Sequence, residues 1–106
     1  MEITINARHI TVPESVRNQA TQRLSRLQRL NRRLTGGTIV FVAERNARRA
    51  EARLAVAGGP PILGHGEGPT LRAALDAAVE RLERQLKRRR ERVIARRTKP
   101  IRITTP

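Results

Sequence analysis

One helix-forming stretch, residues 70–97, constrains the fold more than any other part of this sequence. It contains no Gly or Pro and is rich in Ala, Leu, Glu and Arg, which all favour the α-helix. Apolar side chains recur in it at spacings of three and four residues, so they share one helix face. These residues are Leu71, Leu75, Ala78, Val79, Leu82, Leu86 and Val93. The stripe predicts a long amphipathic helix that covers another layer of the protein.

The same helix carries positive charge beside its apolar stripe. At roughly 100° per residue, one flank holds four arginines, Arg81, Arg84, Arg88 and Arg92. The other flank holds Asp76, Glu80, Glu83 and Lys87. After Leu86 the run Lys87-Arg88-Arg89-Arg90 surrounds the helix with cations. Solvation explains a single cluster, because cations are favoured near a helix C-terminus, but similar clusters recur elsewhere in the chain.

The overall charge indicates a polyanionic partner. The 106 residues contain 23 Lys and Arg against 9 Asp and Glu, a net charge of +14, and a bound polyanion relieves the self-repulsion of such a chain. Arg can hold phosphate bidentately. With one Phe and no Tyr or Trp, the chain lacks the aromatic platform on which single-stranded RNA modules stack bases. We therefore expect it to bind phosphates and overall shape.

The sequence offers little for catalysis. It has no Cys, and its two histidines, His9 and His65, are far apart without a ligand-spaced neighbour. The Gly- and Pro-rich residues 58–68 lack the Gly-Lys-Ser/Thr ending of a phosphate loop. Asp76 is the only Asp and no paired-carboxylate site is evident, and its place on the helix flank favours a structural role. We expect no enzyme, no cofactor, no metal and no small-molecule substrate.

No membrane segment is predicted either. No apolar run approaches a membrane span of about 18 residues, and nothing resembles a signal peptide. We therefore expect a cytoplasmic protein without a membrane partner.

A strand and a helix are predicted at the start of the chain. Residues 2–8 alternate apolar and polar side chains, as a half-buried strand does. Residues 11–14 carry helix-start signals, with Thr11 or Val12 as the cap. The apolar stripe of this helix runs to about Leu34, where Gly36-Gly37 ends it. One flank of the helix holds Arg23, Arg26 and Arg33.

Three further strands are predicted between the helices. Residues 38–44 are continuously apolar and suit a central strand, and residues 49–57 alternate. Residues 61–66 are flanked by Pro and Gly, which favours an edge position. Short turns join these strands, and Thr70 is the expected N-cap of the long helix.

The element order β-α-β-β-β-α predicts an α+β two-layer sandwich. The helical crossover makes the first two strands parallel, and the short turns make the remaining pairs antiparallel. The two apolar helix stripes then cover one face of a four-stranded mixed sheet. We expect the basic helix flanks to lie close together, and the groove between them to bind a phosphodiester backbone.

Motifs in both helices are similar to those of a known family. The long helix reads Ala74-Leu75-Asp76 and then Arg81-Leu82-Glu83-Arg84-Gln85-Leu86-Lys87. The first helix adds Val16-Arg17, Arg23-Leu24 and Arg26-Leu27. Over about residues 1–92 the chain resembles short forms of the ribosome hibernation-promoting factor family, also called ribosome-associated inhibitor A, protein Y or sigma-54 modulation protein. The resemblance implies a sandwich like that of double-stranded RNA-binding domains.

The resemblance also implies a function. Members bind the small ribosomal subunit in the channel used by mRNA and tRNA, and they inhibit translation in stationary or stressed cells. The positions that would face ribosomal RNA are Arg23, Arg26, Arg81, Arg84, Lys87 and Arg88. Charge and geometry add Arg33, Arg89, Arg90 and Arg92. The expected partners are the small ribosomal subunit and its RNA, and we expect the free protein to be a monomer.

Other interpretations stay open. The charge equally suits a general double-stranded nucleic-acid-binding protein without ribosome specificity. We expect one domain, residues 1–97, and a basic, disordered tail, residues 98–106, which also fits a protein–protein regulator that adds a strand to a partner sheet. Whether the protein joins ribosomes into dimers or holds single ribosomes inactive is left open. Gly64 stands where the family usually has Ala, which predicts a looser sheet edge.

Overall fold

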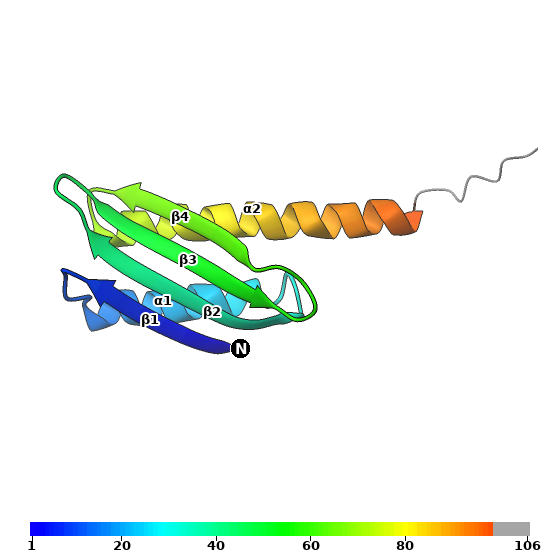
Figure 1. Cartoon of the computed structure of the whole chain (residues 1–106), viewed down its shortest axis with the longest axis horizontal. Coiled ribbons are helices and arrows are strands. Elements are labelled where there is room, and N and C mark those ends of the chain that lie inside the picture. The colour runs from blue at the N-terminus through cyan, green and yellow to red at the C-terminus, as the bar shows by residue number, and fades with distance from the viewer. Residues whose placement is uncertain (99–106) are drawn as a thin grey trace, which may run out of the picture.

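The computed structural model describes residues 1–98, with side chains described through Arg90, and these residues form the elements in the predicted order. They are β1 (Glu2–Arg8), α1 (Glu14–Leu27), β2 (Leu34–Ala43), β3 (Arg48–Val56), β4 (Ile62–Gly68) and α2 (Leu71–Thr98). The sheet order is β1-β2-β3-β4, with β1 parallel to β2 and the other pairs antiparallel (Figure 1). The predicted α+β sandwich is confirmed, whereas the predicted tail lies, from residue 99 on, outside the described residues.

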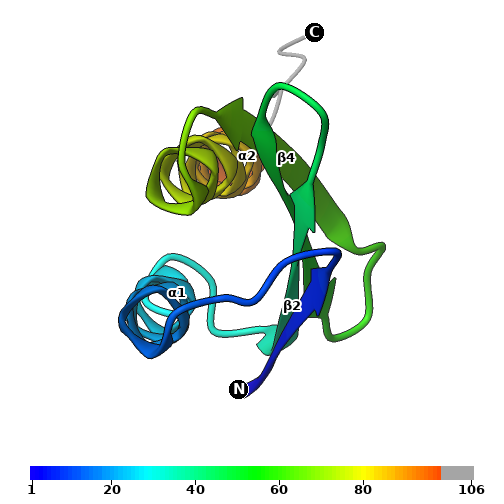
Figure 2. The same ribbon diagram turned by 90° about the vertical axis from the view of Figure 1, so that its left-hand side faces the viewer.

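Both helices cover the same face of the sheet, as predicted. Figure 2 shows α1 and α2 side by side on one face, while no element of residues 1–98 covers the opposite face. Alternate strand residues such as Ile39, Phe41 and Leu54 are fully buried beneath the helices, which contribute Leu24 and Leu82 to the same core. Among residues 1–98, neither helix is long and apolar enough to cross a membrane.

Helix α2 approaches β4 very closely because the facing side of this strand carries glycine at three alternate positions, Gly64, Gly66 and Gly68. A Cβ atom at Gly66 would lie 2.5 Å from the carbonyl oxygen of Ala74 and 2.6 Å from the Cβ of Ala77. Both distances are far shorter than van der Waals contact. The helix backbone therefore rests on the strand backbone, an approach that only glycine permits.

The expectation that Gly64 loosens the sheet edge is wrong. A Cβ at this position would lie 3.0 Å from Cδ2 of Leu82 and 3.3 Å from the carbonyl oxygen of Ala78. Leu82 is fully buried and already takes the place of the missing methyl group. The helix therefore fills the space beside Gly64.

The prediction for the end of α1 is also wrong, because the helix ends at Leu27 and not near Leu34. After it the backbone tightens, and the N–H groups of Arg29 and Leu30 donate to carbonyls three residues back, at 3.1 and 2.9 Å. The side chain of Asn31 then accepts a hydrogen bond from the N–H of Arg33, at 2.9 Å, in a turn that suits Asn. The chain reverses here and enters β2.

The residues that were expected to finish this helix belong to β2. Leu34 is buried in the strand, and Gly36-Gly37 follow it there. A Cβ at Gly37 would lie 3.2 Å from Leu24 and 3.3 Å from Leu54, so this glycine makes room for two core side chains.

The start of α1 differs from its prediction as well. The N-cap is Pro13, which makes no side-chain capping bond, and neither Thr11 nor Val12 caps the helix. Val12 is instead buried in the core. By contrast, Thr70 caps α2 as predicted, because its Oγ1 accepts a hydrogen bond from the N–H of Ala73 at 3.1 Å.

Helix side chains reach both edge strands of the sheet. Nη1 of Arg17 in α1 donates to the carbonyl of Ile5 in β1 at 3.2 Å, and Nε2 of Gln85 in α2 donates to the carbonyl of Leu63 in β4 at 2.5 Å. An edge strand otherwise presents free backbone groups to other chains.

We expect Gly66→Ala to destabilise the protein strongly. The added methyl group would meet backbone atoms of Ala74 and Ala78, which cannot retreat unless α2 shifts, so the free energy of unfolding should fall by about 3 kcal/mol. Urea denaturation followed by circular dichroism measures this loss. Gly59→Ala is the matched control, because a Cβ there meets only Val56 at 3.9 Å, and its effect should stay below about 1 kcal/mol. Equal losses in the two variants would contradict the close approach.

Candidate nucleic-acid interface

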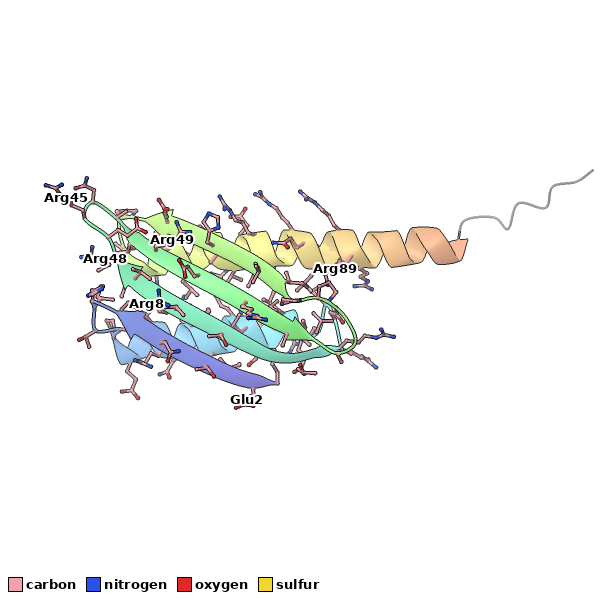
Figure 3. All side chains as sticks on the ribbon, viewed as in Figure 1. Glu2, Arg8, Arg45, Arg48, Arg49 and Arg89 are labelled. Carbon is pink, nitrogen blue, oxygen red and sulfur yellow. The ribbon has the colours of Figure 1, made fainter. Side chains whose placement is uncertain are left out.

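The uncovered face of the sheet is electrically balanced. Its charged side chains are Arg8, Arg49 and Arg53 together with Glu2, Glu51 and Glu67. Arg49 is held among carboxylates, with Nη1 2.8 Å from Glu67 and Nε 3.2 Å from Glu51. Figure 3 shows this face from the front, with Arg8 and Arg49 near one end and Glu2 near the other. A face with equal numbers of both charges offers little attraction to a polyanion.

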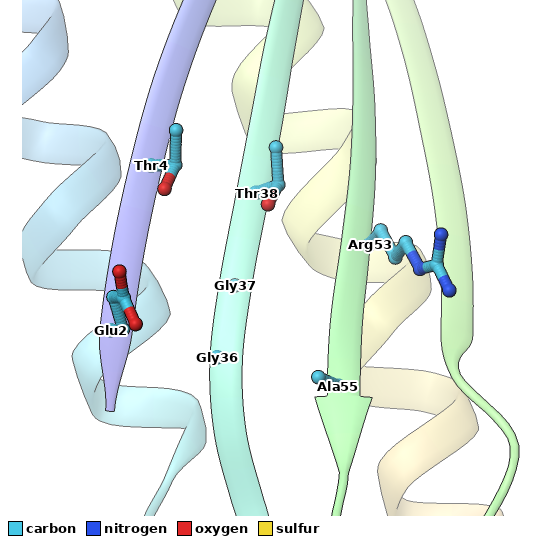
Figure 4. A pocket seen from close by; sticks show the side chains of 7 residues that line it. All are labelled: Glu2, Thr4, Gly36, Gly37, Thr38, Arg53 and Ala55. Atoms are coloured by element: carbon cyan, nitrogen blue, oxygen red, sulfur yellow. The ribbon is translucent and has the colours of Figure 1, made fainter.

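A shallow hollow of about 320 Å³ lies on this face. Gly36 leaves no side chain on this face of β2, and the other residues that line the hollow are Glu2, Thr4, Gly37, Thr38, Arg53 and Ala55 (Figure 4). The hollow places one carboxylate and one guanidinium at the same site. It is therefore poorly suited to phosphate.

Two polar contacts join the helices on the other side of the molecule. Arg23 of α1 forms an ion pair with Asp76 of α2, and Nε of Arg72 donates to Oε1 of Gln19 at 2.9 Å. Each contact joins residues 53 positions apart. The two helices therefore run parallel, with a constant offset between facing residues. Asp76 thus has the kind of structural role that its sequence context favours, and it neutralises one of the predicted RNA contacts.

The second predicted basic flank faces the opposite direction. Nη1 of Arg81 lies 3.1 Å from Nε2 of His65, and Gln85 contacts Leu63, so this side of α2 faces the β4 edge and not α1. Arg88 follows Arg81 by seven residues, two helical turns, and shares its side. The expected groove between two facing rows of arginines is therefore wrong, since Asp76 and not the arginine row faces α1.

Arg84 lies on the outer surface of α2. Nη2 of Arg84 is 3.0 Å from Glu80 one turn earlier, and both side chains are about two-thirds exposed, at 64% and 63%. Exposed pairs of this type contribute only about 0.3–0.5 kcal/mol. A phosphate could displace Glu80 at little cost.

The remaining predicted cations have no carboxylate within ion-pairing distance among residues 1–90. Arg26, Lys87, Arg88 and Arg90 are exposed on the helices, Arg33 is exposed in the loop after α1, and Arg89 is half-buried. Arg92 lies in α2, with its side chain outside the described part.

Two arginines were missed by the sequence prediction. Arg29 and Arg32 are exposed in the loop between α1 and β2, beside Arg33. They were overlooked because the helix was extended to Leu34, which placed them off its basic flank. The local density of arginine in residues 26–33 was the available signal.

Eight cations that have no carboxylate partner among residues 1–90 lie toward one end of the molecule. Both helices run toward this end, and α2 continues past the sheet there (Figure 1). We name the cations of residues 26–33 and 87–90 the basic end. They are Arg26, Arg29, Arg32, Arg33, Lys87, Arg88, Arg89 and Arg90. Phosphates bound here would meet guanidinium groups with few competing carboxylates.

Other kinds of site find no support in the described residues. Among them, no three His, Asp or Glu side chains gather as a metal site.

Comparison with known proteins gives consistent matches. Residues 3–94 match the family described as Sigma 54 modulation protein / S30EA ribosomal protein. The ribosome hibernation promoting factor of Pseudomonas putida is 28% identical over 91 residues, which cover 86% of this chain and 88% of the relative.

Two solved structures share the fold. The N-terminal domain of Thermus thermophilus Protein Y superposes with a TM-score of 0.74 at 30% identity, covering 83% of this chain and 98% of that domain. A ribosomal subunit interface protein from Coxiella burnetii superposes with a TM-score of 0.78 at 19% identity, covering 86% of this chain and 99% of its own. The latter likeness concerns the fold alone.

We expect the Arg23–Asp76 contact to stabilise the pairing of the helices. The two side chains are 26% and 52% exposed, so the coupling energy between them should be about 0.5–1 kcal/mol. Urea denaturation of Arg23→Gln, Asp76→Asn and the double variant measures it. Glu80→Gln is the control, because it removes a carboxylate from the same helix without touching the interhelical contact. A coupling energy of zero would show that the pair does not hold the helices.

Proposed function

The chain belongs to the Sigma 54 modulation protein / S30EA ribosomal protein family, and from this membership we propose that it is a ribosome-associated inhibitor of translation. In this proposal it acts as a hibernation factor of stressed or stationary cells. It binds RNA of the small ribosomal subunit in the channel that mRNA and tRNA use. The names of its relatives, ribosome hibernation promoting factor and ribosomal subunit interface protein, support a ribosomal partner.

The unequal distribution of charge between the two faces carries the proposal. The sheet face is balanced, while the basic end of the helix layer lacks carboxylate partners among residues 1–90. Phe41, the one aromatic residue, is completely buried and cannot stack on a base. The surface therefore suits phosphates, which are the same in every sequence, and recognition depends on the three-dimensional shape of the RNA.

The proposed mechanism is exclusion and needs no reaction. The two-layer domain would occupy space that mRNA and tRNA otherwise fill, with its helix layer against the RNA. Arg23, Arg81 and Arg84 would contribute as well, because each guanidinium has five N–H donors and its protein contact uses only part of them. With about six to ten phosphate contacts, affinity should fall on the order of 10³–10⁵-fold between 50 and 200 mM salt.

We expect the double variant Arg26→Gln, Arg88→Gln to bind small ribosomal subunits more weakly while remaining folded. Both side chains are exposed, and each lost phosphate contact should lower the slope of log K against log salt by about 1. Cosedimentation with purified subunits at several salt concentrations measures the slope. Arg53→Gln is the matched control, since it removes an exposed cation from the sheet face. Equal effects of the double variant and the control would contradict binding by the helix layer.

Competition and cell fractionation test the identity of the partner. Duplex DNA at equal phosphate concentration should displace the protein from subunits only weakly. Equal affinity for duplex DNA, duplex RNA and subunits would instead identify a general double-stranded nucleic-acid binder. Absence of the protein from small subunits of starved cells would refute the ribosomal function.

A further inference from the structure

Helix α2 extends beyond the end of the sheet that it covers. Leu86 is the last buried residue of α2 among those with described side chains, yet the helix continues to Thr98. At 1.5 Å per residue, the twelve remaining residues add about 18 Å. Figure 1 shows this part of α2 beyond the end of the sheet, with no other element beside it. We name residues 87–98 the projecting segment.

The apolar stripe changes to a cation where the sheet ends. Leu75 and Leu82 are buried seven residues apart, and Arg89 occupies the next position of the same series. Figure 3 labels Arg89 close to where α2 passes the end of the sheet. At Arg89 the side of the helix that meets the core therefore carries a charge, whereas Val93, seven positions after Leu86, keeps an apolar residue in the neighbouring row.

Cations also cover the other sides of the projecting segment. Consecutive residues differ by roughly 100° around a helix, so the side chains of the run from Lys87 to Arg90 point in four directions. Three of them are exposed and Arg89 is half-buried. The projecting segment contains seven cations and one acid, Glu91.

We propose that the projecting segment is a second RNA-binding element that lies between two phosphodiester backbones of folded RNA. This inference rests on the proposed function and adds the kind of RNA structure that this part of α2 recognises. A single strand on one side would leave about half of the cations without a phosphate. Two backbones, one on each side of the helix, provide phosphates for the cations on all of its sides.

The dimensions of the helix restrict the site further. An α-helix with side chains is about 10–12 Å wide, whereas the major groove of regular A-form RNA is deep and narrow. The proposed site is therefore a cleft between neighbouring RNA helices, such as a folded RNA provides. A straight RNA duplex should bind the body of the domain without engaging all sides of the projecting segment.

A scan of four single substitutions tests the proposal. The variants are Lys87→Gln, Arg88→Gln, Arg89→Gln and Arg90→Gln. With purified small ribosomal subunits, each variant should lower the slope of log K against log salt by a similar amount, about 0.7–1. With a straight 20-base-pair RNA duplex the four losses should be unequal. Circular dichroism of each variant verifies that the helix content is unchanged.

The pattern of the scan decides the outcome. On subunits, losses confined to Lys87 and Arg90, which share one side of α2, would overturn the two-backbone site in favour of one-sided contact. Unchanged slopes for all four variants would overturn it as well.

Arg26→Gln in the body of the domain separates the two proposals. If it lowers the slope while the four variants do not, the proposed function stands and the projecting segment is not an RNA-binding element. If all five variants bind as the original protein does, both proposals fail.

Discussion

The contact between the glycines of β4 and the alanines of α2 determines how the rest of the molecule is arranged. The strand has no side chains at Gly64, Gly66 and Gly68, and Ala73, Ala74 and Ala77 approach it there. Two backbones in such contact leave α2 little freedom to rotate about its own axis. The rotation that results directs Asp76 toward α1 and Arg81 toward His65 at the β4 edge. The close packing of small residues thus decides which charges face each other.

The charge distribution follows from this arrangement. On the uncovered face, carboxylates surround Arg49 and balance the other cations. In the helix layer, Asp76 and Glu80 neutralise cations before and beside the point where α1 ends, and no described acid compensates those beyond it. Eight cations therefore gather at the basic end without a carboxylate partner among residues 1–90. Repulsion within the basic end is opposed by a continuous apolar core that both helices share with all four strands.

Much of the fold could be predicted because its signals are local. Alternation revealed β1 and β3, paired glycines marked the turn before β4, and Thr70 marked the start of α2. The end of α1 could not be found in this way, since Leu34 fits both the helical stripe and the alternation of β2. Gly36-Gly37 gave a wrong prediction of the helix end for a related reason. Glycine ends helices, but here it leaves space beneath Leu24 and Leu54 within a strand.

The site was harder to predict than the fold. The periodicity of α2 identifies two flanks beside the apolar stripe, and it places Arg81 on one and Asp76 on the other. It does not say which flank faces α1, because that depends on the strand order and on the packing against β4. Asp76 of the acid-rich flank faces α1, so Arg23 meets a carboxylate. The predicted cations are present on the surface, but their grouping is different.

The hydrogen bonds from Arg17 to β1 and from Gln85 to β4 have a consequence for self-association. A strand from another chain could pair with either edge strand only after it displaced the helix side chain that is bonded there. At β1 it would also meet the positive charge of Arg17. Cross-β polymerisation is thereby opposed at both of its starting points. Both edges of the sheet are thereby protected against the addition of a strand from another copy of the chain.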